Sequence, residues 1–506
     1  MSIGAKRAQS SLLQQTVSSF WFWAGLIVVA RIATLLLSEA NLGPDESQYW
    51  FWSQEPAFGY FSKPPVIAWS IGATTALFGN EEWAVRLAAP LYHLGAAAFL
   101  YLAASALFDR RLGFWVGLTW LTLPAVNLSS FVIATDAPLL FFWSAALFIL
   151  VRILNRRDES FASYLGLGAC IGLGLLSKYA MIYFVVAFSL CAAFLPAVRA
   201  ALNLRKLLAA VALIVALIIP NVLWNAAHDF QTVSHTAANA NWSAQRPDPL
   251  ALASFWGGQL IVFGPILFIA LLALVWMHFA SRTIRPAADW RVRFLLIFAL
   301  TPIVIVSAQA FVSRAHANWA VAAYPTATIA VVYWLTTIDE MRIVRASLGL
   351  HALAAVVFIL AITNFAFVDR IGLSSALREI RGWEQQAADV AKAIEARQDR
   401  YDALLIDDRA LMGAMLYYER DRDFEIAAID VNRSTEHHYE AFMAFDPRRH
   451  RRVLFATSRP DDAHVNYRFR QIKPVGETSA ALGPDTARAF RLYDISEYFG
   501  RDAPQD

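Results

Sequence analysis

Residues 18–38 read SSFWFWAGLIVVARIATLLLS, an apolar run in which Arg31 is the only charged residue. An α-helix needs about 20 mostly apolar residues to cross the hydrocarbon core of a bilayer, so this run predicts a membrane-spanning helix. The following stretch, residues 43–52, reads GPDESQYWFW and combines two acids with four aromatic residues. Aromatic side chains are enriched where a membrane meets water. The two stretches together predict a span that leads into a polar loop at the membrane surface.

The composition of the whole chain extends this prediction. Of its 506 residues, 58% are hydrophobic and 16% are charged, whereas about a quarter of the residues of an ordinary soluble chain are charged. The mean hydropathy is +0.45. The two cysteines, Cys170 and Cys191, both lie in apolar runs, so neither a disulfide framework nor a cysteine-based zinc site is expected. An ordinary soluble multi-domain enzyme is excluded.

Ten further apolar runs have a length close to that of a membrane span. With the first, the eleven predicted spans cover residues 18–38, 84–107, 113–128, 137–154, 161–177, 179–197, 207–224, 256–280, 294–312, 319–337 and 346–368. The fifth contains Gly168 and Gly172 at the GxxxG spacing, which lets two helices approach closely.

Lysine and arginine predict the orientation of these spans. With the N-terminus in the cytoplasm, the cytoplasmic segments hold sixteen of these cations and the outer segments hold five. Short cytoplasmic loops of membrane proteins carry such an excess. Eleven spans then place the C-terminus outside, in the periplasm of a bacterium whose inner membrane holds the protein.

Charged residues are concentrated near the C-terminus. Residues 369–506 hold 25 acids and 21 bases, whereas the first 368 residues hold only 37 charged residues. We therefore expect a transmembrane domain at residues 1–368, whose first periplasmic loop is 39–83, and a soluble periplasmic domain at 369–506. Because acids outnumber bases in the second domain, nucleic-acid binding is unsupported.

Sequence patterns in the second domain predict a small α/β fold. Residues 403–408 read as a strand that leads into a helix through Tyr418, and residues 424–429 and 453–457 read as further strands. Four polar side chains of this domain are interpreted mainly as solvated, namely Asp407, Asp408, His437 and His438.

Polar side chains collect in five loops that the predicted orientation places on the outer side. These loops supply acids, cations and imidazole groups, among them Asp45, Lys63, Asp136, Lys178, Arg314 and His316. Each of these residues alone is equally compatible with snorkelling, helix capping or one interhelical hydrogen bond. The convergence of five loops on one membrane face favours an active site.

Such residues suit group transfer from a lipid-linked anionic donor. Asp45 supplies a carboxylate that could act as a general base towards a hydroxyl or an amine. A phosphate leaving group needs fixed positive charge, and Lys63, Lys178 and Arg314 are three of the five outer cations. The aromatic run at residues 49–52 suits an interfacial helix beside a prenyl chain.

At these residues the chain resembles the polytopic GT-C glycosyltransferases, in particular the group of aminoarabinose transferases and protein mannosyltransferases (families 83 and 39). The resemblance covers most of residues 18–325 and implies the GT-C fold: an all-α polytopic membrane domain, here with about 11 spans, followed by the small α/β domain. The motifs that carry it are Asp45-Glu46, Phe61-Ser62-Lys63-Pro64-Pro65, Thr135-Asp136-Ala137-Pro138, Gly174-Leu175-Leu176-Ser177-Lys178, and Pro220-Asn221 with Trp224-Asn225 and His228.

The resemblance also implies roles for individual residues. It makes Asp45 the base and adds Glu46 and Asp136 as catalytic acids. Lys63 and Lys178 become contacts of the donor phosphate, and Arg314 joins them by its loop position. Four more residues are expected to bind substrate, namely Tyr60, Asn225, His228 and His316.

Two positions depart from the pattern of aminoarabinose transferases. Those enzymes usually carry arginine three residues after the catalytic aspartate and an acid just before Lys-Pro-Pro, where this chain has Gln48 and Ser62. The departures weaken the case for aminoarabinose and remove one potential metal ligand. No metal site is predicted, although a divalent ion could still bind the imidazoles of His228, His235 and His316.

We therefore expect an inverting glycosyltransferase that moves a sugar from a polyprenyl-phosphate donor to a periplasmic acceptor. The sugar could be aminoarabinose, galacturonic acid or a hexose, and the acceptor lipid A, lipopolysaccharide core, another glycan or a protein, as for a protein O-mannosyltransferase. The soluble domain is expected to act as a cap or to guide the acceptor. A transporter or flippase would need polar residues at mid-membrane, and a non-catalytic receptor would leave the five converging loops unexplained.

Overall fold

The computed structural model describes residues 3–156, 158, 160–240, 247–280, 289–432, 434–463 and 465–500. This part of the chain is mostly helical, with a small sheet near the C-terminus. The helices that precede the sheet are α1 (Ile3–Leu36), α2 (Pro44–Ser53), α3 (Val66–Phe78), α4 (Glu82–Arg86), α5 (Ala88–Leu107), α6 (Arg110–Thr122), α7 (Pro124–Leu128), α8 (Asp136–Leu154), α9 (Phe161–Ser177), α10 (Ile182–Phe194), α11 (Pro196–Ala201), α12 (Leu204–Ala227), α13 (Gln231–Ala240), α14 (Pro249–Val262), α15 (Pro265–Ala280), α16 (Trp290–Val312), α17 (Tyr324–Thr337), α18 (Met341–Thr363) and α19 (Phe365–Arg370).

Several helices are long and apolar enough to cross a membrane. Among the described residues six qualify, or seven if the bent pair α14 and α15 forms one span. α12 and α18 leave many large apolar side chains exposed, including Leu208, Leu223, Leu353 and Val356. A helix with such a surface belongs in lipid rather than in water. The chain is therefore a multi-span membrane protein, and the number eleven stays a prediction.

The structure divides the predicted third span, residues 113–128. α6 ends at Thr122, Leu123 is extended with ψ of 139°, and α7 begins at Pro124. A proline disfavours helical backbone in the residue before it, because its ring carbon clashes with that residue. The apolar run therefore forms one helix and a short second one that leads towards α8.

The C-terminal part contains a five-stranded sheet with the order β2-β1-β3-β5-β4. β1 pairs in parallel with β2 and β3, whereas β5 pairs antiparallel with β3 and β4. β1 is fully buried because α20 and α21 cover one of its faces and Phe455 and Val465 share a core with the other. The elements are α20 (Trp383–Glu395), β1 (Ala403–Ile406), α21 (Arg409–Tyr418), β2 (Ile426–Ala428), α22 (His438–Phe442), β3 (Arg452–Thr457), β4 (Phe469–Gly483) and β5 (Thr486–Tyr498).

β1, α21, β2 and β3 confirm the strands and the helix predicted for this part of the chain. The long hairpin of β4 and β5 was not predicted. Most residues of β4 are exposed, so its sequence has no continuous apolar run that would predict a strand. Its pairing with β5 also shifts register between Pro474 and Gly476.

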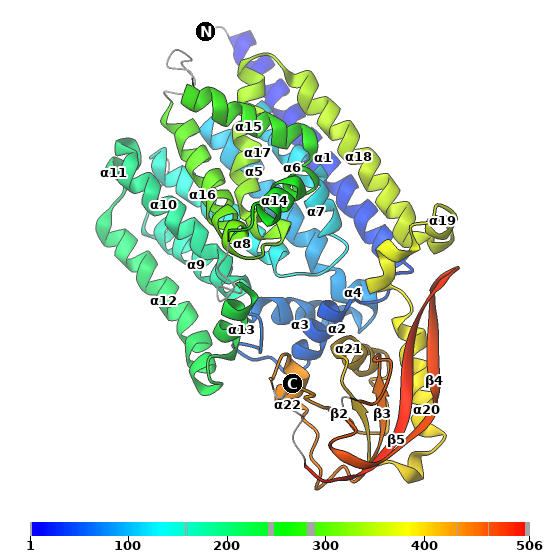
Figure 1. Cartoon of the computed structure of the whole chain (residues 1–506). Helices are drawn as coiled ribbons and strands as arrows, with labels where there is room; N and C mark the ends of the chain where they lie inside the picture. The colour runs from blue at the N-terminus through cyan, green and yellow to red at the C-terminus, as the bar shows by residue number, and fades with distance from the viewer. Residues whose placement is uncertain are drawn as a thin grey trace.

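α2 and α3 lie between the long helices and the sheet, and α21 runs beside α2 (Figure 1). The two helices approach closely at Gly413, where an added Cβ would lie 2.4 Å from Oγ of Ser47. The ring of Trp50 packs edge-on against Tyr417, with 4.9 Å between the ring centres. The hydroxyl of Tyr418 accepts a hydrogen bond from the backbone N–H of Leu42. The C-terminal part is therefore attached firmly to the first loop.

The predicted close helix contact at the GxxxG pair is confirmed. An added Cβ on Gly168 would lie 2.5 Å from the carbonyl oxygen of Ala210 in α12, and one on Gly172 would lie 2.7 Å from a methyl group of Leu217. Replacing Gly168 with alanine should push α9 and α12 apart, and overpacking of this kind costs roughly 1–3 kcal/mol.

Gly168→Ala should therefore lower the melting temperature of the purified protein in detergent, measured by tryptophan fluorescence. Gly166→Ala is the matched control, because its Cβ would meet only the end of the Ile149 side chain at 3.4 Å. Alanine is favoured over glycine in a helix by about 1 kcal/mol, so this control should melt at the same temperature or higher. Equal melting temperatures for the two variants would contradict the packing argument.

Candidate active site

The site begins with the local structure of α2. Gly43 is extended and Pro44 takes the first helical position, where its missing N–H leaves no helical hydrogen bond unmade. The carboxylate of Glu46 accepts a hydrogen bond from the N–H of Gly43 at 3.0 Å, which closes the start of the helix. Asp45 and Glu46 lie in the first turn, where the helix dipole stabilises negative charge.

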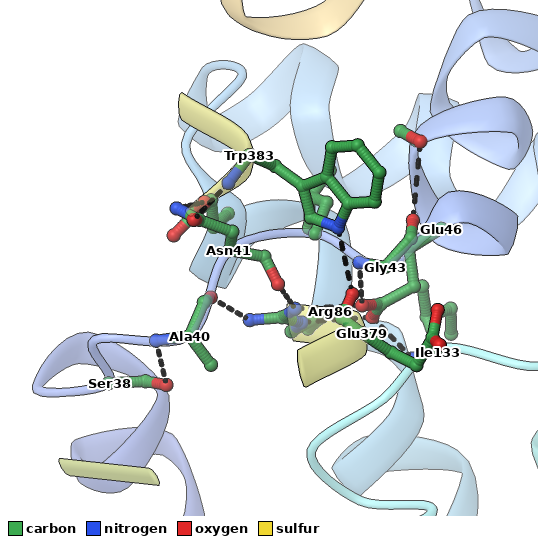
Figure 2. A network of polar contacts seen from close by, with 12 residues as sticks. Ser38, Ala40, Asn41, Gly43, Glu46, Arg86, Ile133, Glu379 and Trp383 are labelled. Carbon is green, nitrogen blue, oxygen red and sulfur yellow. Dashed lines mark hydrogen bonds and ion pairs between the residues drawn. The ribbon is translucent and has the colours of Figure 1, made fainter. Parts of the chain in front are cut away.

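Glu46 and Arg86 form a buried ion pair, with side chains only 1% and 2% exposed (Figure 2). Oε1 of Glu46 accepts from Nε of Arg86 at 2.9 Å and from the N–H of Ile133 at 3.0 Å. Oε2 lies 2.7 Å from Nη2 of the same arginine. The guanidinium also donates to the carbonyl oxygens of Ala40 and Asn41 at 2.8 and 2.7 Å. These bonds hold together three segments that are far apart in the sequence.

The same network reaches the C-terminal part of the chain. The side-chain oxygen of Asn41 accepts from the N–H of Trp383 at 3.0 Å, and the indole N–H of Trp383 donates to the carbonyl oxygen of Glu379 at 2.9 Å (Figure 2). Because both carboxylate oxygens of Glu46 are occupied inside this network, the side chain fixes the position of α2.

Asp45 faces the opposite way from its neighbour Glu46 and is accessible, with 60% of its side-chain surface exposed. Its Oδ1 lies 2.7 Å from Nη2 of Arg409, and the hydroxyl of Tyr49 donates to Oδ2 at 3.5 Å. The surrounding protein partly desolvates the carboxyl, which raises its pKa, but the guanidinium of Arg409 and the ammonium of Lys63 more than offset this, so the pKa of Asp45 lies below its ordinary value. The carboxylate is therefore ionised at neutral pH and can accept a proton.

A second acid and cation lie on the ends of α8 and α9. Asp136 begins α8, and Lys178 follows the last residue of α9. Nζ of Lys178 lies 2.7 Å from Oδ1 of Asp136, and the amide of Asn318 donates to Oδ2 at 3.2 Å. Both charged side chains are partly exposed.

The ammonium of Lys63 interacts electrostatically with Asp45 and with the ion pair of Asp136 and Lys178. Burial lowers the pKa of its ammonium, the positive charge of Lys178 lowers it further, and the carboxylates of Asp45 and Asp136 oppose both effects. Two buried prolines, Pro64 and Pro65, follow it and restrict the backbone. The structure thus brings Asp45, Lys63, Asp136 and Lys178 together, and we call these four residues the polar cluster.

Three of the residues predicted to bind substrate make mainly local contacts. The hydroxyl of Tyr60 donates to the carbonyl oxygen of Trp52 at 3.0 Å, and the two rings stack. Asn225 is buried and donates to the carbonyl oxygen of Asn221 at 3.0 Å. His228 stacks on Trp224 with ring centres 4.1 Å apart. The side-chain oxygen of Asn225, in contrast, is buried with no hydrogen-bond partner among the described residues.

The last two predicted residues lie in the loop between α16 and α17. Arg314 is exposed and donates to the carbonyl oxygen of Asn239 at 3.3 Å. His316 is exposed and packs edge-on against Trp319.

The imidazole of His235 faces the cluster more directly. Burial, together with the positive charges of Lys63 and Arg409, lowers its pKa to about 4, so it is neutral at physiological pH. In the part of the chain that the structure describes, no group of three or more histidine, cysteine or acidic side chains is arranged to hold a metal ion. His228, His235 and His316 accordingly do not form a common ligand set there.

Sequence analysis missed the residues that the C-terminal part contributes. Arg409 contacts Asp45, and the imidazole of His438 lies edge-on against Phe51 and Trp52 of α2. His437 accepts from the N–H of Glu440, and its side chain is 12% exposed. The two histidines therefore lie mostly buried near α2 instead of in solvent.

Fold and site together define a multi-span membrane transferase whose polar cluster lies at one end of its helices. Residues 62–224 match the family described as dolichyl-phosphate-mannose-protein mannosyltransferase. The chain is 35% identical to the lipid A galacturonosyltransferase RgtD of Rhizobium johnstonii over 86% of its own length and 90% of that protein. It is 30% identical to the lipopolysaccharide core galacturonosyltransferase RgtA of the same organism, over 40% of this chain and 41% of that one.

A similar fold occurs in ArnT from Cupriavidus metallidurans, in a crystal structure with bound undecaprenyl phosphate. The TM-score is 0.63 at 17% identity, covering 94% of this chain and 97% of that one. The chain belongs to the family of the rhizobial lipid A galacturonosyltransferase RgtD, and it shares the GT-C fold of ArnT. The predicted family and enzyme class are thereby confirmed.

Replacing Arg86 should destabilise the protein strongly. Arg86→Met leaves the carboxylate of Glu46 buried without its partner, and breaking a buried pair in this way costs about 3–5 kcal/mol. We expect much less monodisperse protein after extraction in detergent and a lower melting temperature.

The matched control is Arg378→Met, which removes an exposed ion pair with Glu379 at 3.3 Å. Exposed pairs contribute about 0–1 kcal/mol, so this variant should behave like the wild type. Similar yields and melting temperatures for both variants would show that the buried pair does not hold the first loop.

Proposed function

We propose that this glycosyltransferase transfers galacturonic acid from a polyprenyl-phosphate carrier to lipid A, at the periplasmic face of a bacterial inner membrane. The observation that carries the proposal is the accessible carboxylate of Asp45 in one cluster with the cations Lys63 and Lys178. The name of the 35% identical relative supports the sugar and the acceptor. The undecaprenyl phosphate in the crystal structure of similar fold supports the carrier.

Lipopolysaccharide core is the second candidate acceptor. Two further relatives, RgtA and RgtB, at 30% and 29% identity, are named as core galacturonosyltransferases, but each matches only part of this chain. The match to the lipid A enzyme extends over most of both chains, so lipid A is preferred.

In the proposed reaction, Asp45 takes the proton from a hydroxyl group of the acceptor. The acceptor oxygen forms a bond to the anomeric carbon as the bond from that carbon to the phosphate oxygen breaks, which inverts the configuration. The bonding electrons leave with the phosphate, whose growing charge Lys63 and Lys178 stabilise. Asp136 holds Lys178 in place through the 2.7 Å ion pair.

The remaining predicted residues take supporting roles in this proposal. Glu46 fixes α2 through its pair with Arg86 and does not meet the substrate. Tyr60, Asn225 and His228 bind the substrate. Arg314 and His316 are contacts for the phosphate and the substrate from the exposed loop after α16.

An apolar groove provides a path for the prenyl chain. It has a volume of about 270 Å³ and lies between α9 and the helices α12 and α13. Leu175, Leu176 and Tyr179 line the end next to Lys178, and Val222 and Phe230 line the exposed side. A phosphate at Lys178 would therefore have its hydrocarbon tail in an apolar channel that opens towards lipid.

We further propose eleven spans, a cytoplasmic N-terminus, a transmembrane domain at 1–368 with a catalytic first loop at 39–83, and a periplasmic domain at 369–506. The excess of cytoplasmic lysine and arginine supports the orientation. Three shorter apolar helices, Phe20–Leu36, Phe161–Ser177 and Tyr179–Phe194, lie in predicted spans and support the higher count.

Asp45→Asn should abolish the modification of lipid A. Mass spectrometry of lipid A and core would compare the wild-type strain with a deletion strain carrying the wild-type gene, the Asp45→Asn gene, or no gene. We expect one hexuronic acid mass to be absent without the gene and absent or strongly reduced with Asp45→Asn, since a general base contributes about 10²- to 10⁴-fold to the rate.

Asp421→Asn is the control, because Asp421 is an exposed acid in the turn after α21; it should restore the modification at equal protein levels. Full restoration by Asp45→Asn would contradict the mechanism. Unchanged lipid A and core in the deletion strain would contradict the acceptor.

Lys63→Met should weaken binding of the donor. A hydrogen bond to a charged group contributes about 1.5–3 kcal/mol, which corresponds to an increase in KM for polyprenyl-phosphate galacturonic acid of roughly ten- to a hundredfold. Initial rates in proteoliposomes would measure it, with Lys392→Met as control, because Lys392 is an exposed residue of α20. An unchanged KM would exclude Lys63 from the phosphate site.

A further inference from the structure

Three residues after Asp45, α2 carries the uncharged side chain of Gln48. Positions 45 and 48 lie on the same side of a helix, less than one turn apart. A guanidinium at position 48 would therefore lie next to the carboxylate at position 45.

In this protein a guanidinium reaches that place from the C-terminal part of the chain. Nη2 of Arg409 lies 2.7 Å from Oδ1 of Asp45, and Nη1 donates to the side-chain oxygen of Gln48 at 3.1 Å. Arg409 thus bridges the two positions of α2 at once, from a point 364 residues away in the sequence.

The local structure around Arg409 fixes where its side chain begins. Arg409 is the first residue of α21, just beyond the carboxyl end of β1. Oδ1 of Asp408 accepts from the N–H groups of Ala410 and Leu411, both at 2.9 Å, and so caps the helix. The carboxylate of Asp408 therefore acts as a helix cap, and this cap fixes the position of Arg409 at the start of α21.

The packing of α21 on α2 sets the distance to Asp45. Gly413, one turn after Arg409, touches Ser47, so a side chain there would force the two helices apart. Two turns along the helix, Tyr417 donates a hydrogen bond to the carbonyl oxygen of Asn80 at 2.5 Å. The approach of the guanidinium to the carboxylate is thus built into the contact between the two parts of the chain.

We propose that Arg409 is a positioning residue of the active site, which makes the C-terminal domain a component of that site. This inference rests on the proposed function, in which Asp45 is the base. The guanidinium holds Asp45 in its ionised form and orients one carboxylate oxygen, leaving the other for the proton of the acceptor. It supplies this charge from α21, beside the uncharged side chain of Gln48.

Charged and titratable groups surround Asp45 on several elements. Tyr49 belongs to α2 itself, Lys63 comes from the following loop, His235 from α13, and Arg409 and Tyr439 from the C-terminal part. The negative charge of Asp136 acts on two of these groups, Tyr49 and Lys63. Of these, only Lys63 and Arg409 lower the pKa of Asp45 by their positive charge.

Removal of Arg409 should therefore change the pH dependence of transfer. Without the guanidinium, desolvation of the carboxyl is opposed only by the charge of Lys63 and the hydrogen bond from Tyr49, so the pKa of Asp45 rises. A base must be unprotonated, so activity should be lost at a higher pH on the acid side. A neighbouring arginine lowers the pKa of an aspartate by about one to three units, so the acid limb of kcat/KM should move upward by about as much.

The experiment measures kcat/KM against pH in proteoliposomes that contain polyprenyl-phosphate galacturonic acid and lipid A. Four proteins are compared: wild type, Arg409→Gln, the double variant Gln48→Arg/Arg409→Gln, and Tyr418→Phe. We expect the acid limb to move upward in Arg409→Gln and to return in the double variant, whose guanidinium comes from α2. Tyr418→Phe loosens the contact with Leu42 without touching Asp45, so its melting temperature should fall while its acid limb stays in place.

Three outcomes would each contradict a different claim. If Arg409→Gln reduced kcat/KM equally at every pH, Arg409 would be only a structural contact and the inference would be overturned. A shifted limb that the double variant fails to restore would overturn the claim that a guanidinium next to Asp45 sets the acid limb by its charge. No transfer by the wild type itself would overturn the proposed function instead.

Discussion

The ion pair of Glu46 and Arg86 holds the segments around the site in place, because both side chains are almost fully buried and fully hydrogen bonded. A buried charge is tolerated only with a partner and with hydrogen bonds for its remaining polar atoms. Here those bonds come from the first loop, from α4 and from the segment before α8. The rotation of α2 about its axis is thereby fixed, and with it the direction in which Asp45 points.

The net charge of the side chains near Asp45 complements the charge of the phosphate in the proposed reaction. With Arg409, the polar cluster has three cations and two carboxylates, so its net charge is +1, which matches a phosphodiester donor. When Asp45 takes up the proton, the net charge becomes +2. The departing phosphate monoester approaches a charge of −2 near neutral pH. The same set of side chains therefore balances the reacting phosphate before and after transfer.

Sequence alone predicted the local features and missed those that depend on packing between distant segments. Length and apolar content indicated the helices, and the charge of residues 369–506 indicated the separate C-terminal part. The polar cluster could be predicted because its members lie at the ends of spans on one face. The exposure of Asp45 and the burial of Glu46 could not be predicted, since only the fold buries one of them and exposes the other. Arg409 was missed because no pattern relates it to position 45.

The contact between Asp45 and Arg409 also has a consequence for how the protein is made. The first loop leaves the ribosome long before residue 409, since 364 residues separate the two side chains. A growing chain thus contains the carboxylate, but not yet the guanidinium that would orient it. The carboxylate would gain its partner only after the C-terminal part has folded against α2, so the base of a nascent chain would have a higher pKa than that of the finished protein.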